Sequence, residues 1–416
     1  MRVVVLGGGV IGVATAYFLA RGGAEVTVVD RQPGPARETS YANAGLIAPA
    51  HAYAWASPRA PGVLLRSLWR DDTALRLKPR LDPRLLGWGL RFLANCGAAR
   101  NRANTLTKLR LCIYSREQLI ALRVAEGLAY DAVTKGALYL YRDADHLGIA
   151  TANARLLADH GLRIETIDRE HCLDIEPALA PVADRIAGAI YAPDDESGDC
   201  RLFTEALARR SADLGVVFRW NETVSGLDGD AERVAAALTD RGRIDGDAFV
   251  LALGSYSPAI VRGIGVHLPI YPVKGYSLTF PIKDADAAPT VPGVDEHYLV
   301  AFARFGDRLR VTATAEFAGY DTGFAPGDFT VMTRVARELF PAAADFDRPE
   351  HFACLRPMTP DGPPIMGRGR HRNLWLNTGH GHIGWTMAAG SGRIVADLIL
   401  GREAEIDLAG LTLAGR

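Results

Sequence analysis

The chain has 416 residues, of which 48% are hydrophobic and 23% are charged, and its formal net charge is −1. This composition is typical of a globular protein, and the balanced charge excludes a bulk attraction for nucleic acid, so we expect no nucleic-acid partner. The length exceeds what one hydrophobic core usually supports, which predicts two domains.

The cysteines are odd in number, scattered and without a CxxC pair, which predicts a reducing compartment and neither structural zinc nor an iron–sulfur cluster. They are Cys96, Cys112, Cys172, Cys200 and Cys354. No uninterrupted apolar run reaches the ~18 residues of a membrane span. The apolar N-terminus is not expected to be a signal peptide, because its glycines match a phosphate loop. We therefore expect a cytoplasmic protein.

The first thirty residues predict a strand, a glycine turn, a helix and a second strand that ends in an acid. The apolar run Val3–Leu6 precedes Gly7, Gly9 and Gly12, and Asp30 stands eighteen residues after the last glycine. The first glycine permits a tight turn, the second lets the backbone approach a pyrophosphate, and the third lets the helix pack on the strand. The helix N-terminus then faces the phosphates, and the acid binds the ribose hydroxyls. This pattern predicts a dinucleotide site, and a glycine turn without a nucleotide is the alternative.

Between Leu64 and Cys112, eleven basic residues stand against three acidic ones, and apolar residues are interleaved with them. This mixture suits an amphipathic surface on anionic lipid, and an ordinary solvated helical face around a core is the alternative. The basic residues are Arg66, Arg70, Arg76, Lys78, Arg80, Arg84, Arg91, Arg100, Arg102, Lys108 and Arg110, the acidic ones Asp71, Asp72 and Asp82, and the apolar ones Leu85, Leu86, Trp88, Leu90, Phe92 and Leu93.

Strand patterns dominate after residue 129, and strand–helix–strand alternation resumes only at Asp199. We therefore expect an α/β fold (α+β overall) in which a Rossmann-like nucleotide domain is interrupted by a second domain with a mixed or antiparallel sheet. The nucleotide domain is assigned residues 1–80, 195–255 and 355–416, and the second domain residues 81–194 and 256–354. The expected strands are residues 136–141, 187–191, 216–220, 248–254, 276–280, 309–314 and 374–377, and the expected helices are 83–127, 202–214, 329–340 and 387–400.

A second glycine turn, Thr378–Trp385, joins the last strand to a long helix. Its free N–H groups and partial positive charge would stabilise the electron-rich edge of a reduced flavin, which a nicotinamide does not require. An ordinary tight turn is the alternative. His380 and His382 could share a face, but two ligands without a nearby acid or cysteine do not make a metal site, so we expect no metal.

Upstream, Arg356 opens a segment that four prolines stiffen. A rigidly mounted guanidinium is bidentate and always charged, so it would clamp a substrate carboxylate. A surface arginine in a salt bridge is the alternative.

Together these motifs resemble those of bacterial D-amino acid dehydrogenases, members of the D-amino acid oxidase flavoprotein superfamily that includes glycine oxidase and sarcosine oxidase. The resemblance covers essentially the whole chain. It is carried by Gly7–Gly12, Glu38–Gly45, Gly198–Cys200, Leu355–Gly362 and Asn377–Gly392. It implies a fold of the D-amino acid oxidase type and FAD bound in extended form.

The resemblance also implies which residues bind FAD. Those at the pyrophosphate and adenosine would be Gly7, Gly9, Val10, Ile11, Gly12, Asp30, Arg31 and Val224. Those along the pyrophosphate and isoalloxazine would be Ser40, Asn43, Ala44, Gly45 and Gly254. Those at the pyrimidine edge of the flavin would be Gly381, His382, Ile383, Gly384, Trp385 and Thr386.

On the substrate side, similarity to glycine oxidase implies that Arg356 binds the substrate carboxylate and that Tyr276 lies beside the flavin. A core position is the alternative for Tyr276. His51 and Tyr53 would line the same cavity or pack in the core, and Arg304 is a second candidate for the carboxylate.

Two positions depart from the pattern or extend it. His382 stands where many relatives have a small hydroxylated residue. Cys354 has the spacing of the flavin-linking cysteine of sarcosine oxidases, so a thioether to FAD is an alternative to the non-covalent binding that we expect.

The resemblance implies oxidative deamination of D-amino acids to 2-oxo acids and ammonia, by hydride transfer from Cα to flavin N5. The electron acceptor would be a quinone, a dye or oxygen, and the 64–112 region would permit peripheral contact with the inner membrane. One alternative is oxidation of secondary amino acids such as D-proline, hydroxyproline, sarcosine or of glycine. Others are an NAD-dependent dehydrogenase and a nucleotide-binding subunit without catalysis.

Overall fold

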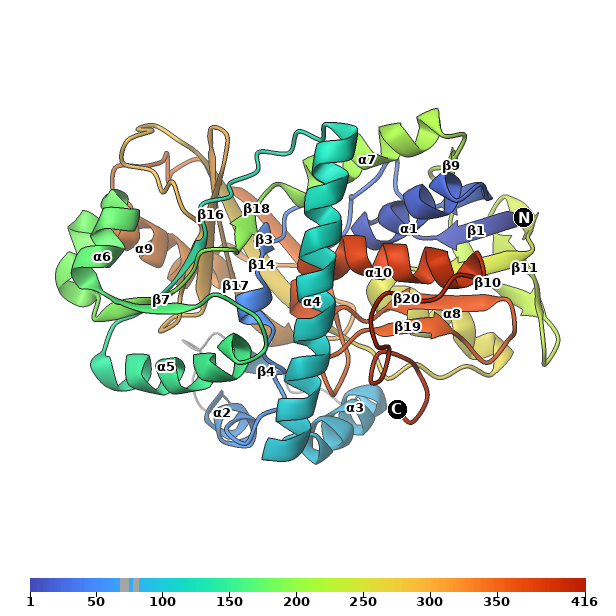
Figure 1. The fold of residues 1–416 in the computed structure, drawn as a ribbon, viewed down its shortest axis with the longest axis horizontal. Coiled ribbons are helices and arrows are strands. Elements are labelled where there is room, and N and C mark those ends of the chain that lie inside the picture. The colour runs from blue at the N-terminus through green and yellow to red at the C-terminus, as the bar shows by residue number, and fades with distance from the viewer. Residues whose placement is uncertain (68–74, 78–81) are drawn as a thin grey trace.

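The computed structural model describes residues 1–67, 75–77 and 82–416. A mostly parallel sheet with its helices occupies the right side of Figure 1, and a larger mixed sheet occupies the left side. The long helix α4 (Ala98–Glu126) runs between the two, and both chain ends lie on the side of the parallel sheet (Figure 1).

The parallel sheet has the strand order β19-β20-β13-β1-β2-β9 in the described chain, with β19 antiparallel at one edge. Its central strand is the run Val3–Leu6, which is buried on both faces, as expected for a parallel strand between helical layers. The prediction of a Rossmann-like unit is thereby confirmed. The strands are β1 (Arg2–Leu6), β2 (Glu25–Val29), β9 (Val217–Arg219), β13 (Ala248–Leu251), β19 (Ile365–Arg368) and β20 (Leu374–Thr378).

Helices α1, α7, α10 and α4 pack next to one another on this side of the molecule. Helix α1 contacts both α7 and α10, and α10 also contacts α4. The expected domain division at residue 81 therefore separates α4 from a helix with which it packs. The bounds are α1 (Val10–Arg21), α7 (Cys200–Asp213), α8 (Ser257–Val261) and α10 (Gly384–Ile399).

The larger sheet has the order β18-β14-β17-β16-β15-β5-β7-β6, with β4 paired to β17. It is mixed because β15 pairs with β5 in parallel while the other neighbours along this order are antiparallel. Its strands are β4 (Leu75–Leu77), β5 (Ala137–Tyr141), β6 (Glu165–Asp168), β7 (Gly188–Ala192), β14 (Tyr271–Pro281), β15 (Gly293–Asp295), β16 (Val300–Phe305), β17 (Arg308–Phe317) and β18 (Glu350–Met358). Its helices are α5 (Ala144–Ala158), α6 (Arg169–Ile175) and α9 (Thr330–Leu339).

Several elements were not predicted. An antiparallel sheet follows β9, and its strands give only a weak periodic signal, because β10 and β12 contain glycine and aspartate and β11 is rich in alanine. The segment around Arg356 is the strand β18, paired with β14 along its length, rather than an isolated stiff stretch. The further strands are β3 (Leu46–Ile47), β8 (Glu196–Ser197), β10 (Val224–Gly229), β11 (Val234–Thr239) and β12 (Gly242–Asp245).

Helices α2 (Ala60–Ser67) and α3 (Pro83–Ala94) lie together at the bottom of Figure 1. Asp82 caps α3 by accepting a hydrogen bond from the Arg84 N–H at 3.0 Å, and Pro83 occupies the first helical position. In the described part of the chain, no helix is both long and apolar enough to cross a bilayer.

Candidate active site

A cavity of about 1640 Å³ extends from the glycine turn after β1 to helices α2 and α3. The larger sheet supplies one wall through β14, β17 and β18, and the turn before α10 supplies another. Most of the expected cofactor residues line it: Gly7, Gly9, Val10, Ile11, Asp30, Arg31, Ser40, Asn43, Ala44, Gly45, Val224, Gly254, Gly381, His382, Ile383, Gly384 and Trp385.

The first glycine turn leaves the N-terminus of α1 open toward the cavity. Gly9 is the N-cap, and no side chain of its own caps the helix. A Cβ on Gly12 would come within 1.9 Å of the Gly7 carbonyl oxygen, so Gly12 permits the close approach of helix and turn and does not itself face the cavity. The Ser40 hydroxyl accepts a hydrogen bond from the Val10 N–H at 3.1 Å, which holds the Glu38–Gly45 loop against this end.

Asp30 lies at the end of β2 with its carboxylate turned back toward the glycine turn. It accepts hydrogen bonds from the Gly8 N–H at 2.6 Å and from the Gln32 N–H at 2.8 Å. Burial raises the pKa of Asp30, while these two backbone donors oppose the increase. Nearby, the Arg31 guanidinium lies 4.1 Å from the centre of the Tyr256 ring. This end of the cavity is therefore rigid and polar, as a ribose site requires.

The second glycine turn forms a one-turn 3₁₀ helix, Gly381–Ile383, directly before α10. No side-chain hydrogen bond caps either helix. Among the described residues, Trp385 Nε1 and Asn377 Oδ1 are buried polar atoms without a hydrogen-bond partner, and both residues line the cavity. Thr386 lies behind the wall, where its hydroxyl accepts from the Ala48 N–H at 3.0 Å.

Two helix N-termini that no side chain of their own N-cap residue caps therefore line one long cavity. An extended dinucleotide fits this donor set, with its pyrophosphate at α1 and the electron-rich edge of a flavin at α10. A nicotinamide would leave the second terminus unused. The residues present thus fit FAD.

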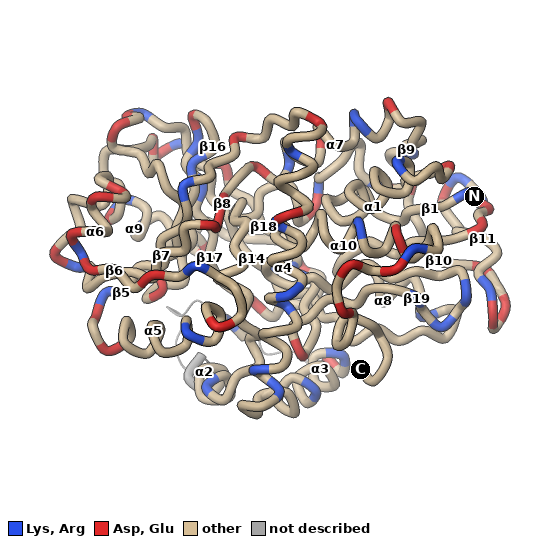
Figure 2. Tube along the Cα trace, viewed as in Figure 1, with Lys and Arg blue, Asp and Glu red and all other residues tan. Residues whose placement is uncertain are grey.

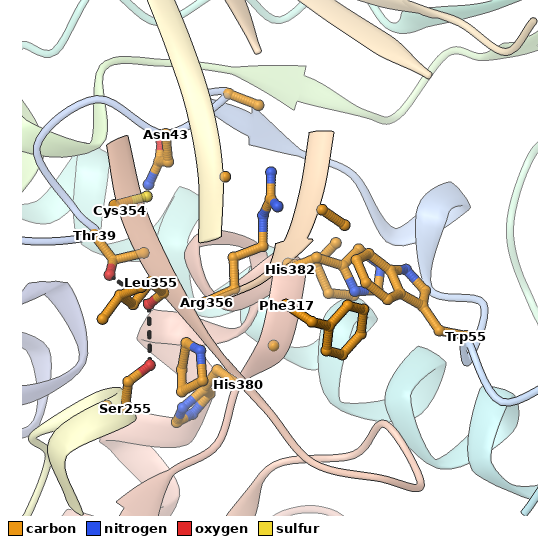
Figure 3. Close-up of a pocket in the computed structure, with 18 of the residues that line it drawn as sticks. Thr39, Asn43, Trp55, Ser255, Phe317, Cys354, Leu355, Arg356, His380 and His382 are labelled. Atoms are coloured by element: carbon orange, nitrogen blue, oxygen red, sulfur yellow. Dashed lines mark hydrogen bonds between the residues drawn. The ribbon is translucent and has the colours of Figure 1, made fainter. Parts of the chain in front are cut away.

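Arg356 stands in the middle of this site (Figure 3). Its Nη1 donates to the Thr314 carbonyl at 2.7 Å, and its guanidinium lies over Gly275 of β14, where a Cβ would come within 2.4 Å of Cζ. Burial lowers the pKa of Arg356, and no carboxylate of the described residues lies within 4 Å of it. A buried, unpaired guanidinium in a cavity is suited to bind an anionic group.

Two predicted substrate residues are placed elsewhere. Tyr276 contributes to the cavity wall, but its ring packs edge-on against Phe329 and its hydroxyl donates to the buried Glu316 at 2.9 Å. Its side chain thus projects from the opposite face of β14 to Gly275, because successive strand residues alternate. Arg304 lies outside the cavity lining, where it donates to the Gly306 and Ala285 carbonyls. The packing of Tyr276 is that of the alternative core position, although the residue also contributes to the cavity wall, and the role of Arg304 as a second carboxylate ligand stays a prediction.

The predicted residues His51 and Tyr53 do line the cavity, with His382 and an aromatic partner that was not predicted, Trp55. The His382 ring stacks on Trp55 at 4.9 Å and meets the His51 ring edge-on at 5.8 Å. His380 turns away, and its Nε2 lies 3.1 Å from the Ser391 hydroxyl. The two histidines thus do not share a face, and the described residues contain no cluster of three potential metal ligands.

Cys354 lines the cavity two residues before Arg356. Figure 3 places it beside Thr39 and Asn43. Burial raises the pKa of the Cys354 thiol. Cys354 therefore favours the protonated thiol over the thiolate, and the thiol is a poor nucleophile toward a cofactor.

Residues of α2 and α3 line the far end of the cavity. The exposed apolar side chains there are Val63 (42%), Leu65 (63%), Leu86 (67%), Leu90 (61%) and Leu93 (48%). Trp88 and Phe92 of the same segment are buried, and Lys108, counted above with the basic surface, is fully buried with its Nζ donating to the Tyr53 carbonyl at 2.9 Å. Arg70, Asp71, Asp72, Lys78 and Arg80 lie outside the described residues.

Sequence reasoning missed several cavity residues. Gly275 stands next to Tyr276 in the sequence, but a single glycine does not indicate a binding site. Thr314 and Glu296 belong to no recognisable motif. Gly275 and Thr314 meet Arg356 only through strand pairing and a bulge in β17, and Glu296 reaches the same cavity from the turn after β15.

Comparison with known proteins agrees with this geometry. Residues 2–398 match the family model described as DAO, FAD dependent oxidoreductase. The chain is 48% identical over 416 residues, the full length of both proteins, to D-amino acid dehydrogenase 2 of Mesorhizobium japonicum. It is 48% identical over 412 residues, 99% of this chain and 98% of the relative, to D-amino acid dehydrogenase of Paramagnetospirillum magneticum.

Solved structures share the fold. Glycine oxidase from Geobacillus kaustophilus superimposes with a TM-score of 0.75 at 23% identity, covering 100% of this chain and 99% of that one. L-proline dehydrogenase from P. horikoshii gives a TM-score of 0.74 at 18% identity, over 99% and 96% of the two chains. At these identities the likeness concerns the fold alone. With its sequence relatives, its glycine turns and its cavity, the chain belongs to the DAO family of FAD-dependent oxidoreductases.

Proposed function

We propose that this protein oxidises D-amino acids to imino acids, which hydrolyse to 2-oxo acids and ammonia. The observation that carries the proposal is the buried guanidinium of Arg356, unpaired and directed into the cavity between the two open helix ends. An α-amino acid offers the carboxylate that this group lacks. The full-length relatives named D-amino acid dehydrogenase support the D configuration.

In this proposal Arg356 binds the substrate carboxylate and fixes the orientation of Cα. Its own position is held by the Thr314 carbonyl, so little side-chain freedom remains to be lost when the substrate binds. Trp55, His382 and His51 form an aromatic wall that excludes water from the reacting carbon. When bound, FAD supplies the two-electron acceptor.

We further propose that FAD is bound without a covalent bond to Cys354. The thiol is buried and its pKa is raised, so little thiolate forms at neutral pH. The two helix N-termini and the Glu38–Gly45 loop offer enough polar contacts to retain the cofactor without a thioether.

Peripheral membrane contact through α2 and α3 is the remaining part of the proposal. Their exposed leucines surround the cavity mouth, so an apolar electron acceptor such as a quinone would reach the site from a lipid surface. Figure 2 shows blue segments beside α2 and α3. Among the described residues, Arg84 and Arg91 belong to α3, and Arg100 and Arg102 belong to the first turns of α4. Anionic lipid would complement them.

The purified protein tests the proposal directly. We expect a flavin absorbance band that bleaches when D-alanine is added without oxygen and persists when L-alanine is added. A colourless protein would exclude the cofactor. Bleaching by sarcosine or proline alone would assign the enzyme to secondary amino acids instead.

A further inference from the structure

Glu296 places a carboxylate inside the cavity, where no predicted function uses it. It follows β15, and its backbone N–H donates to the Leu140 carbonyl at 3.0 Å, which continues the pairing of β15 with β5. Its side chain is 18% exposed, and it lines the cavity as Val294 does two residues earlier. Glu296 opens the turn between β15 and β16, and its backbone hydrogen bond to β5 holds it at the wall of the cavity.

The Glu296 carboxylate has no permanent cation beside it. Within the described chain, the charged or titratable partner closest to it is His51, whose Nδ1 lies 3.8 Å from Oε1. Burial and the nearby Lys108 lower the pKa of His51 to about 4, so this imidazole is neutral at pH 7. Burial, and after it the adjacent Asp295 carboxylate, raises the pKa of Glu296 to about 7. The pair is therefore not an ion pair, and the carboxylate is ready to receive a cation.

The other groups that face Glu296 do not neutralise it. Tyr53, which follows the Pro49–His51 turn, and Tyr139 and Tyr141 of β5 all have raised pKa values because of burial, so they remain uncharged. Asp295 on the same strand is paired with Arg142 at 2.6 Å. With a pKa of about 7, Glu296 carries its negative charge increasingly as the pH rises above 7, and that charge is then available to a bound cation.

Glu296 and the Arg356 guanidinium lie at the same level of the larger sheet. The register pairs Val294 with Ala301 and Ala301 with Thr312, and all three line the cavity. Glu296 and Thr314 each stand two residues further along, on strands that run in the same direction. The guanidinium lies over Gly275 of β14 and donates to the Thr314 carbonyl of β17, so the Glu296 carboxylate and the guanidinium line one cavity from different strands of the same sheet.

A cavity lined by both charges offers an α-amino acid a guanidinium for its carboxylate and a carboxylate for its ammonium group, with charge-assisted hydrogen bonds at each end. We propose that Glu296 binds the α-ammonium group of the substrate and accepts its proton before the oxidation. This inference rests on the proposed function and adds to it the group that recognises the amine.

The chemistry balances. One N–H bond of the ammonium breaks and an O–H bond forms on the Glu296 carboxylate, which leaves an electron pair on the neutral amine. That pair forms the C=N bond as the Cα–H bond breaks and its electrons leave as hydride. The substrate loses two electrons, and the oxidant is the FAD of the proposed function. His51, neutral and 3.8 Å away, orients the carboxylate and is a positioning residue.

The test is Glu296→Gln in the FAD-loaded enzyme, which keeps the shape and removes the charge. We measure anaerobic flavin reduction by D-alanine from pH 6 to pH 9 in a stopped-flow instrument. The variant is expected to lower the rate at pH 7 about 100-fold, since a positioned base contributes at least this factor. It is also expected to lack the rise toward alkaline pH that the proposal predicts for the wild type. The matched control is Glu165→Gln, exposed on β6, which should change neither value.

A binding measurement separates amine recognition from a structural defect. Propionate lacks the ammonium group, so its dissociation constant, read from the flavin spectrum, should be unchanged in Glu296→Gln, while the KM for D-alanine rises. An unchanged pH profile and an unchanged KM, in an enzyme that D-alanine reduces, would overturn the inference alone. A wild-type holoenzyme that no D-amino acid reduces would overturn the proposed function and the inference with it.

Discussion

The guanidinium of Arg356 rests on the backbone of Gly275, so closely that a Cβ at residue 275 would come within 2.4 Å of the Arg356 Cζ. On the next strand, a bulge lets Thr314 adopt φ +65°, and its carbonyl accepts from Arg356 Nη1 at 2.7 Å. Arg356 is therefore positioned by two backbones rather than by an acid, and its charge remains free for a ligand.

Gly275→Ala is expected to displace the guanidinium, because the new methyl group would occupy its place. We expect the KM for D-alanine to rise about 10- to 100-fold, the equivalent of the 1–3 kcal/mol cost of overpacking. The flavin spectrum should not change. The control is Gly148→Ala in α5, where a Cβ meets no atom within 4 Å. A raised KM in the Gly148→Ala control, or an unchanged KM in Gly275→Ala, would contradict this account.

Arg356→Lys keeps the charge but loses the planar fork. We expect kcat/KM for D-alanine to fall about 100-fold, since one charge-assisted hydrogen bond contributes roughly 1.5–3 kcal/mol. Steady-state kinetics measure this. Arg304→Lys is the matched control, because Arg304 lies outside the cavity and bonds only the Gly306 and Ala285 carbonyls among the described residues. Equal losses in both variants would return Arg304 to the substrate site.

Acid precipitation of the holoenzyme should release all of its flavin into the supernatant, because the Cys354 thiol is buried with a raised pKa. Cys354→Ser should retain FAD and activity, since neither depends on a thioether. Absorbance of the supernatant and of the redissolved protein measures the distribution. Yellow protein after precipitation, lost in Cys354→Ser, would show a covalent link.

Leu86→Ser with Leu90→Ser is expected to weaken sedimentation with anionic vesicles. These side chains are 67% and 61% exposed, and burying each in lipid is worth roughly 1.5 kcal/mol or more, so we expect a loss of about 100-fold in partition. The matched control, Val124→Ser with Leu214→Ser, alters exposed apolar residues of α4 and of the end of α7. If the wild type itself stays in solution with such vesicles, the membrane proposal fails.

His380 predicts acid sensitivity of the fold. Burial lowers its pKa from 6.5 to about 3, so between these values the unfolded chain binds a proton that the folded chain does not. Stability is therefore fully present above pH 6.5 and declines as the pH falls, by up to about 1.4 kcal/mol per pH unit. His380→Gln should flatten the fall in Tm between pH 7.5 and pH 5, whereas exposed His160→Gln should not. Parallel curves for wild type and His380→Gln would refute the assignment.

Much of the cofactor end could be predicted because its signals are local. Each of these signals is a short stretch of sequence whose residues also lie together in the structure. They are the Gly7–Gly12 turn, the acid at residue 30 and the Thr378–Trp385 turn. Their strands and helices followed from apolar periodicity, as β1, α1 and α10 show.

The substrate end could not be predicted in the same way. Whether Tyr276 faces the cavity depends on the register in which β14 pairs with β18. A shift of one residue in that register would exchange the two faces of the strand. Lys108 was counted as surface because a basic residue on a long helix is usually exposed, yet its Nζ is buried against the Tyr53 carbonyl.

The sequence by itself determined that the chain has a dinucleotide fingerprint and that its Rossmann-like unit is interrupted, and it predicted Arg356 as the candidate carboxylate ligand. Only the tertiary structure decided what surrounds that arginine. Gly275, Thr314 and Glu296 lie on three different strands, and neighbouring residues in the chain do not reveal which strands pair or in what register. Strand pairing is a long-range property, so the geometry of the substrate site emerges only when the sheet has formed.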